Sequence, residues 1–200
     1  MSDVQIEDSY IDDAYIETYT GRRFYITDPA PDFNIQDIAH ALSLTCRYGG
    51  HCKRFYSVAE HSVLVARIME HCAFGDPLEG LLHDATEAYV GDMPAPFKHL
   101  VSDFTALDEQ LEEKLARWAG MLWPRQSAYK IADWFALFIE ARYLMPGEGR
   151  DYKDPMVYRN AALTVGDQMN LRAASFGMEP RRAENLFLET YERLTQRRAA

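Results

Sequence analysis

Hydrophobic residues recur every three to four positions along most of the chain, and this spacing predicts a protein built from α-helices. Residues that commonly cap helices precede several of these hydrophobic stripes: Asn34, Ser57 and Asp76 each stand directly before one. Glycine and proline interrupt the pattern between the stripes. The expected helices cover residues 35–48, 58–69, 77–90, 104–122, 127–144 and 180–194. The pattern therefore favours an all-α fold, a single helical bundle.

Three parts of the chain lack this periodicity. Residues 1–33 contain an acidic start, a short extended piece within residues 20–26 and a proline-rich loop, and we expect them to form an N-terminal lead-in. Residues 91–98 contain two prolines and a glycine, which predicts a loop with a fixed path. Residues 150–178 are expected to be a looser region. We therefore expect the lead-in to be followed by one helical bundle with a C-terminal helix over residues 34–200.

The charge of the chain limits its partners. The formal net charge of −10 argues against a nucleic-acid polymer or an anionic membrane surface as a partner. A small anionic substrate is compatible with it, because a metal and a few basic side chains make a pocket locally positive. The three cysteines, Cys46, Cys52 and Cys72, have no zinc-finger spacing and do not suggest a disulfide framework. Since the chain starts without an apolar leader and has no stretch of membrane-spanning length, we expect a cytoplasmic protein.

Four ionisable residues lie within the hydrophobic stripes, where a charge is costly without a partner. They are His61, the neighbouring pair His83 and Asp84, and Asp133, from three different predicted helices. Such a set suits one divalent transition metal ion (Co, Mn, Fe, Ni or Zn). Taken alone, His61 is more typical of a hydrogen-bonded core histidine. Stripes that face one bundle core bring such ligands together, so the whole set predicts a metal site in the core.

The order of the motifs around these residues resembles the HD-domain phosphohydrolases. The motifs are Val58-Ala-Glu-His61-Ser, His83-Asp84-Ala-Thr-Glu87, Gly91-Asp92-Met-Pro-Ala-Pro-Phe-Lys98 and Lys130-Ile-Ala-Asp133. They are most similar to the small 5′-deoxynucleotidases and the phage-type deoxynucleoside triphosphate hydrolases, over about residues 34–145. The resemblance implies a single HD-domain helical bundle whose metal is held by His61, His83, Asp84 and Asp133.

The same resemblance implies catalytic roles for Glu87 and Asp84. Glu87 would position or activate the water, or protonate the leaving group. The pair Arg47 and Tyr48 stands where the nucleotidases carry an Arg-Trp pair that contacts phosphate and nucleoside. The changed aromatic leaves the base preference open. Without the resemblance, Arg47 is better explained as a helix-end charge that complements the macrodipole, and Tyr48 as a half-buried aromatic.

Three further residues are expected to bind substrate. Asp92 matches a residue that contacts the sugar in these relatives, and Lys98 and Lys130 match basic residues that face the phosphates. The acidic side of the helix over residues 104–122, which includes Asp108, is expected to face solvent. His40, His51 and His71 are expected to be ordinary surface, loop or helix-face histidines.

The resemblance implies a metal-dependent phosphohydrolase that cleaves phosphate from (deoxy)nucleoside 5′-phosphates. A deoxynucleoside triphosphate triphosphohydrolase and a non-catalytic nucleotide-binding HD protein are the alternatives. A two-iron oxygenase or a two-metal phosphodiesterase would need more histidines between the dyad and Asp133, where only His99 lies. The expected partner is a small nucleotide, and relatives of this kind often form dimers, which favours a homo-oligomer of two or more copies.

Overall fold

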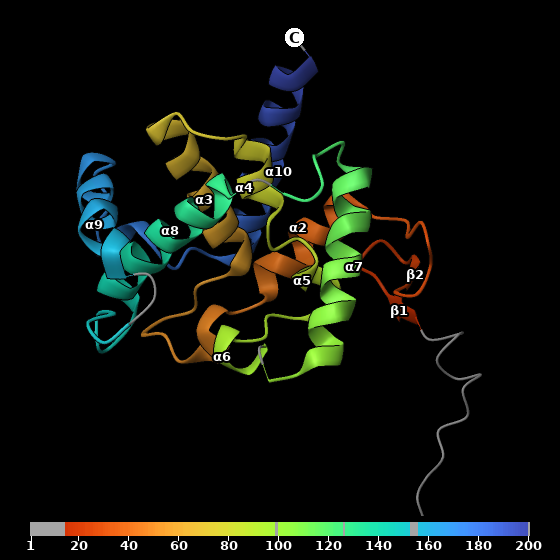
Figure 1. The fold of residues 1–200 in the computed structure, drawn as a ribbon, viewed down its shortest axis with the longest axis horizontal. Coiled ribbons are helices and arrows are strands. Elements are labelled where there is room, and N and C mark those ends of the chain that lie inside the picture. Colours follow the sequence, from red (N-terminus) through yellow and green to blue (C-terminus); the bar gives the residue numbers. More distant parts are fainter. Residues whose placement is uncertain (1–14, 99, 126, 153–155, 200) are drawn as a thin grey trace, which may run out of the picture.

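The computed structural model describes residues 15–98, 100–125, 127–152 and 156–199, and these are mostly helical (Figure 1). The elements are β1 (Tyr15–Glu17), β2 (Arg23–Tyr25), α2 (Ile35–Leu44), the 3₁₀ turn η1 (Arg47–Gly50), α3 (Val58–Cys72), α4 (Pro77–Leu82), α5 (Glu87–Val90), α6 (Ala95–Lys98), α7 (Ser102–Trp118), α8 (Ala128–Leu144), η2 (Met156–Tyr158), α9 (Arg159–Gln168), η3 (Ala173–Ser175) and α10 (Pro180–Ala199). The helical class is confirmed. Among these residues, no helix is both long and apolar enough to cross a membrane.

A small antiparallel sheet is the exception to the all-α prediction. Strand β1 pairs with β2, with Tyr15 opposite Tyr25 and Glu17 opposite Arg23. The extended piece expected within residues 20–26 therefore exists and has a partner strand. Phe24 is buried at the centre of β2 and stacks on Tyr89 of α5, which ties the hairpin to the helices. The rest of the acidic start, residues 1–14, lies outside the described residues.

Helix α3 lies at the centre of the molecule, in contact with α2, α4, α8 and α10 (Figure 1). Apart from Arg67, every residue from Val58 to Met69 is buried, including the polar ones. Ser57 caps this helix as predicted, accepting a hydrogen bond from the Glu60 amide at 3.1 Å. Because α3 has neighbours on all sides, any functional group that it carries is held by packing.

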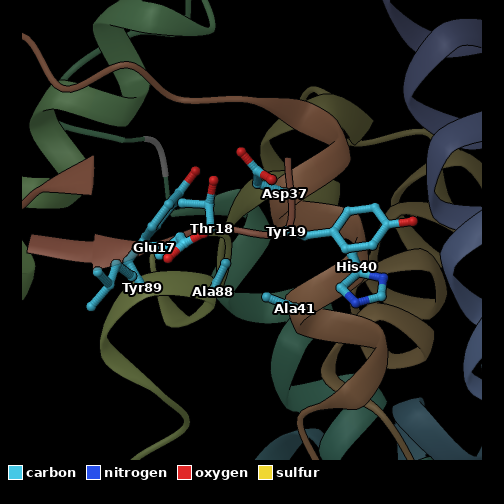
Figure 2. Close-up of a pocket in the computed structure, with 9 residues that line it drawn as sticks. Glu17, Thr18, Tyr19, Asp37, His40, Ala41, Ala88 and Tyr89 are labelled. Carbon is cyan, nitrogen blue, oxygen red and sulfur yellow. The ribbon is translucent and has the colours of Figure 1, made fainter. Parts of the chain in front are cut away.

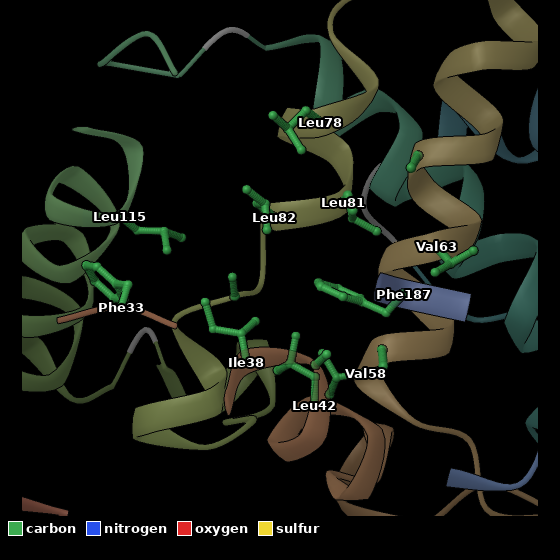
Figure 3. Packing of buried hydrophobic residues seen from close by; sticks show 14 of the residues in the cluster. Phe33, Ile38, Leu42, Val58, Val63, Leu78, Leu81, Leu82, Leu115 and Phe187 are labelled. Atoms are coloured by element: carbon green, nitrogen blue, oxygen red, sulfur yellow. The ribbon is translucent and has the colours of Figure 1, made fainter. Parts of the chain in front are cut away.

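Two groups of buried hydrophobic residues occupy opposite sides of α3. The first lies between α2, α3, α4, α7 and α10, and Phe187 of α10 packs there among Val58, Val63 and Leu81 (Figure 3). The second lies between α3, α8 and α9. Helix α9 corrects the prediction of a looser region over residues 150–178, since it packs along α8. Its stripe is short, with only Ala162 and Gly166 buried, so periodicity gave little signal.

The predicted helix over residues 77–90 is broken in the structure. Asp76 caps α4 as expected, but α4 ends at Leu82 and α5 begins at Glu87. Between them the chain tightens: the Ala85 amide bonds the Leu82 carbonyl and the Glu87 amide bonds the Asp84 carbonyl. In a regular helix, neighbouring residues point about 100° apart. The tightened turn has about three residues per turn, so the side chains of His83 and Asp84, whose Nε2 and Oδ2 atoms lie 3.1 Å apart, bend toward one another from the backbone.

Two other predicted boundaries also differ. Helix α2 keeps its Asn34 cap but ends at Leu44, so Arg47 and Tyr48 lie on the separate turn η1 rather than at a helix end. The predicted loop over residues 91–98 contains the short helix α6. The helix end expected at Gly49 is therefore wrong by several residues, and the single turns η1 and α6 are too short to be read from the periodic pattern.

The C-terminal helix is tied to α3 at two places. The Glu60 carboxylate accepts hydrogen bonds from the Gly177 and Met178 amides just before α10. The Glu60 side chain, three residues after the Ser57 cap, therefore bonds a distant segment and not the start of its own helix. At the other end of α3, Glu70 accepts two hydrogen bonds from Arg193, at 2.5 and 2.9 Å.

Candidate metal centre

His61, His83 and Asp133 meet between α3, the turn after α4, and α8. Their ligand atoms all lie within 4.8 Å of one another, and the group can hold a metal ion. The Nε2 atoms of the two imidazoles are 3.2 Å apart, and Asp133 Oδ1 lies 3.2 Å from His61 Nε2 and 3.8 Å from His83 Nε2. Asp84 Oδ2 approaches the same two nitrogens, at 3.5 and 3.1 Å. All four residues predicted as metal ligands are thus brought together.

These separations match a shared ion. Ligand atoms about 2.0–2.2 Å from one ion lie about 2.8–3.6 Å apart in tetrahedral or octahedral coordination. Four of the five separations given above, from 3.1 to 3.5 Å, fall in that range. The donor set of two imidazoles and two carboxylates is a mixed nitrogen and oxygen set, which suits divalent transition metals.

The outer nitrogens of both imidazoles fix which nitrogen carries the proton. His61 Nδ1 lies 2.6 Å from Glu140 Oε1, and His83 Nδ1 lies 2.8 Å from the Gly80 carbonyl oxygen. A carboxylate and a carbonyl only accept, so each Nδ1 donates. In a neutral imidazole the facing Nε2 then carries a lone pair. When both imidazoles are neutral, lone pairs and carboxylate oxygens converge without a donor between them, and a cation satisfies this arrangement.

Glu140 is a functional residue that the sequence analysis missed. Its side chain is fully buried, at 0% exposure. It accepts hydrogen bonds from His61 Nδ1, from the Tyr56 hydroxyl at 2.9 Å and from the Tyr48 hydroxyl at 2.7 Å. Burial raises the pKa of Glu140, but His61, Arg47 and these bonds outweigh it and lower the pKa to about 2. A partner of this kind orients a metal-binding histidine.

Local charges also set the ionisation of the ligands. Burial and the nearby Arg47 lower the pKa of His61, yet the carboxylates of Glu140 and Asp133 outweigh them and raise it to about 9. Burial alone would raise the pKa of Asp84, but its interactions with His83, His61 and Arg47 hold it well below its usual range. The negative charge of the carboxylates thus dominates this centre.

Arg47 and Glu87, both predicted from the sequence, lie beside the centre. Arg47 Nη1 is 3.3 Å from Asp84 Oδ2, and its guanidinium also pairs with Glu140 at 3.5 Å. Glu87 Oε2 is buried and has no hydrogen-bond partner among the residues that the structure describes. Burial, followed by the charges of Asp84 and Asp92, raises the pKa of Glu87 well above its usual value. The centre therefore has a cation and a carboxyl group of unusual basicity at its edge.

The other predicted substrate-binding residues are less directly placed. Asp92 is half-buried near Asp84 and Arg47, close enough for their charges to act on it. Lys130 is exposed, one turn before Asp133 on α8. Lys98 pairs with Asp108, which is buried and also accepts a hydrogen bond from the Thr86 hydroxyl. The expectation that Asp108 faces solvent is therefore wrong.

Arg125 supports the turn that carries His83. Its side chain is only 3% exposed, it donates to the His83 carbonyl at 3.0 Å and it pairs with Glu112 at 2.5 Å. The guanidinium lies 4.8 Å from the centre of the Tyr129 ring, and that ring lies 5.9 Å from the His83 ring. Sequence reasoning gave no signal for this residue, because Arg125 precedes a helix and lies outside every motif.

A separate cavity of about 520 Å³ opens beside the hairpin. The rings of Tyr19 and His40 stack there with their centroids 3.7 Å apart, and Asp37 and Tyr89 also line the cavity (Figure 2). Its lining includes none of the predicted site residues. It does include His40, whose ring also contacts Glu184 at 3.2 Å, so His40 has a partner from the C-terminal helix.

Comparison with known proteins places the chain among bacterial relatives. No family model matches it. It is 38% identical to the uncharacterized protein YfdR of Escherichia coli K12 over 68% of the chain and 75% of that protein. The chain belongs to the YfdR family. RCAP_rcc00048 of Rhodobacter capsulatus, 31% identical over 80% of the chain and 91% of its own length, falls in the same family. Both relatives are uncharacterized, so the family assigns no activity and the function is argued from the site.

Proposed function

We propose that this protein is a metal-dependent phosphohydrolase of the HD-domain type, cleaving phosphate from (deoxy)nucleoside 5′-phosphates. One observation carries the proposal: the lone pairs of His61 and His83 and the oxygens of Asp84 and Asp133 converge, with Arg47 at their edge. A bound cation beside a guanidinium favours an anionic ligand. The resemblance of the motifs to those of the HD phosphohydrolases is the reason for proposing a nucleotide as this anionic ligand.

The chain's own residues support this chemistry. A divalent ion held by the four ligands would neutralise charge on a phosphoryl oxygen and acidify a water. Arg47 is held by two carboxylates, so its guanidinium stays in place to bind phosphate. Glu87 follows Asp84 by one turn and has an oxygen without a partner, so it takes the proton-transfer role. Phosphoryl transfer needs mainly positioning and charge, which these residues supply.

The pairing of Lys98 supports a short phosphate chain. A triphosphate needs counter-charge for its outer phosphates, and Lys98 and Lys130 were expected to face the phosphates of either a short or a long chain. In the structure Lys98 is paired with the buried Asp108, whereas Asp84, which pairs with Arg47, would share its charge with the bound ion and leave the guanidinium less neutralised. Lys130 is exposed and remains available. We therefore favour the monophosphate over the triphosphate as substrate.

The test is a panel of nucleoside mono-, di- and triphosphates, in ribose and deoxyribose forms, assayed for phosphate release with Mn²⁺, Co²⁺, Ni²⁺, Fe²⁺ and Zn²⁺. We expect release from monophosphates that depends on one of these ions. Asp84→Ala serves as the matched control, and it should lose both bound metal and activity. Bound metal without release from any nucleotide would instead favour a non-catalytic nucleotide-binding protein. Faster release of inorganic triphosphate would favour the triphosphohydrolase.

A further inference from the structure

The two oxygens of Glu140 serve two different parts of the site. Oε1 accepts from His61 Nδ1 at 2.6 Å and from the Tyr56 hydroxyl at 2.9 Å. Oε2 accepts from the Tyr48 hydroxyl at 2.7 Å and pairs with Arg47 Nε at 3.5 Å. One oxygen therefore faces the metal ligand, and the other faces the turn η1 that carries Arg47 and Tyr48.

The turn η1 needs such an anchor. Tyr48 has φ 59° and ψ 25°, in the left-handed region that costs energy for a residue with a Cβ atom. Gly49 and Gly50 follow with positive φ and add conformational freedom when the turn is unanchored. The Tyr48 hydroxyl bond to Glu140 holds the strained residue in place. Since Arg47 directly precedes Tyr48, the same bond fixes where the guanidinium points.

We propose that Glu140 is a positioning residue that couples the metal ligand His61 to the phosphate-binding turn Arg47–Gly50. The inference rests on the proposed function, because it takes Arg47 as the group that binds phosphate. Through Oε1, Glu140 keeps the proton on His61 Nδ1 and so leaves Nε2 free for the ion. Through Oε2, it keeps the turn closed around Arg47. A change at Glu140 thus affects metal and phosphate binding together, while a change on one side affects one of them.

The test uses three variants and two binding measurements that do not depend on turnover. Mn²⁺ affinity of the metal-free protein and inorganic phosphate affinity of the Mn²⁺-loaded protein are measured by titration calorimetry. Glu140→Gln keeps the side-chain shape but removes the charge. We expect its Mn²⁺ affinity to fall roughly 10- to 100-fold, as for other partners of metal-binding histidines. Its Co²⁺ complex should also show a shifted visible absorption band, which loss of stability alone would not produce.

Tyr48→Phe and Tyr56→Phe form the matched pair, since each removes one hydroxyl from one oxygen of the same carboxylate. Tyr48→Phe should leave Mn²⁺ affinity close to that of the wild type and weaken phosphate binding roughly tenfold, because a hydrogen bond to a charged group is lost from the turn. Tyr56→Phe should change phosphate binding little, because the bond from His61 to Oε1 remains. If Glu140→Gln fails to fold, this pair still decides the proposal.

Three outcomes would overturn the coupling. They are wild-type Mn²⁺ affinity in Glu140→Gln, an equal loss of Mn²⁺ affinity in Tyr48→Phe and Glu140→Gln, and equal phosphate effects in the two tyrosine variants. Failure of the proposed function is a separate result. It would appear as a wild-type protein that binds Mn²⁺ and phosphate yet hydrolyses no nucleotide. The Mn²⁺ and phosphate affinities of the three variants would still test the coupling in that case.

Discussion

Glu87 is the residue whose surroundings differ most from those of an ordinary carboxylate. It follows Asp84 by one turn, is half-buried, and has an oxygen without a hydrogen-bond partner in the described part of the chain. An unpartnered buried carboxyl oxygen lowers stability, so its presence beside the centre supports a chemical role. Its carboxyl group is not among the atoms that converge at the centre. A change at Glu87 should therefore affect proton transfer and leave metal binding intact.

Glu87→Gln should therefore keep Mn²⁺ and nucleotide binding and lose turnover. We expect kcat to fall roughly 10²- to 10⁴-fold, the usual contribution of a general acid or base. Calorimetry gives the metal affinity, and steady-state kinetics give kcat and KM. Glu113→Gln on the surface of α7 is the matched control and should behave as the wild type. A kcat close to that of the wild type in Glu87→Gln would remove Glu87 from the mechanism.

The residues of the centre were predictable as far as their chemistry was visible along the sequence. His61, His83, Asp84 and Asp133 stood out because each is ionisable within a hydrophobic stripe. Glu140 meets the same criterion, seven residues after Asp133 between Ile139 and Ala141, and was overlooked because the stripe already had a carboxylate. Its partners Tyr48 and Tyr56 come from another part of the chain, and no local pattern reports such a contact.

Among the elements, the C-terminal helix α10 is joined to the central helix α3 by hydrogen bonds between charged side chains. Arg193 and Arg197 of α10 both bond Glu70 near the end of α3. The Arg193 hydrogen bond is the main cause that lowers the pKa of Glu70, followed by the charges of both arginines, which outweigh burial. The pair is partly exposed, so its effect on stability is modest.

Arg193→Ala should lower the free energy of unfolding by about 0.5–1 kcal/mol at pH 7. Because the pair lowers the pKa of Glu70 in the folded state, its stabilisation is complete above the unfolded value of about 4.3 and is lost as the pH falls through the folded value. Urea unfolding of wild type and variant should therefore differ at pH 7, and the difference should shrink as the pH falls below about 4. Arg117→Ala, which removes an exposed pair within α7, is the control and should have a smaller effect at pH 7. A difference that persists unchanged at pH 3 would assign the effect to packing of the Arg193 stem.

The elements that the sequence predicted well are those long enough to show a period. Helices α3, α7, α8 and α10 each bury residues at helical spacing and were found within a few residues of their ends. The break between α4 and α5 was not predictable from periodicity, because hydrophobic residues continue through Ala85. Contacts from Arg125 and from the metal-binding groups fix that turn, and these contacts are long-range.

A metal ion bound at the centre would stabilise the whole molecule. An ion that binds only the folded chain adds about 2.7 kcal/mol when its concentration is about 100 times its Kd. For a chain of this size, that corresponds to a rise in Tm of about 5–10 °C. The effect is global because the ligands come from α3, the turn after α4, and α8, which all belong to the packed interior.

Removal of metal with a chelator should therefore lower Tm by about 5–10 °C, and added Mn²⁺ should restore it. Differential scanning calorimetry measures both changes. Asp133→Ala should show little response to either treatment, because it lacks one ligand. A chelator effect of the same size in Asp133→Ala would mean that the stabilising ion binds elsewhere.

The spread of the metal ligands along the chain also sets when the centre can first form during synthesis. His61, His83 and Asp84 leave the ribosome before Asp133 and Glu140, which follow about 50 residues later. At typical elongation rates of about 5–20 residues per second, that interval is about 3–10 seconds. Until α8 emerges and docks on α3, the nascent chain has two imidazoles and one carboxylate but no closed site. A metal ion held by all four groups would therefore bind only after α8 has reached its place beside α3.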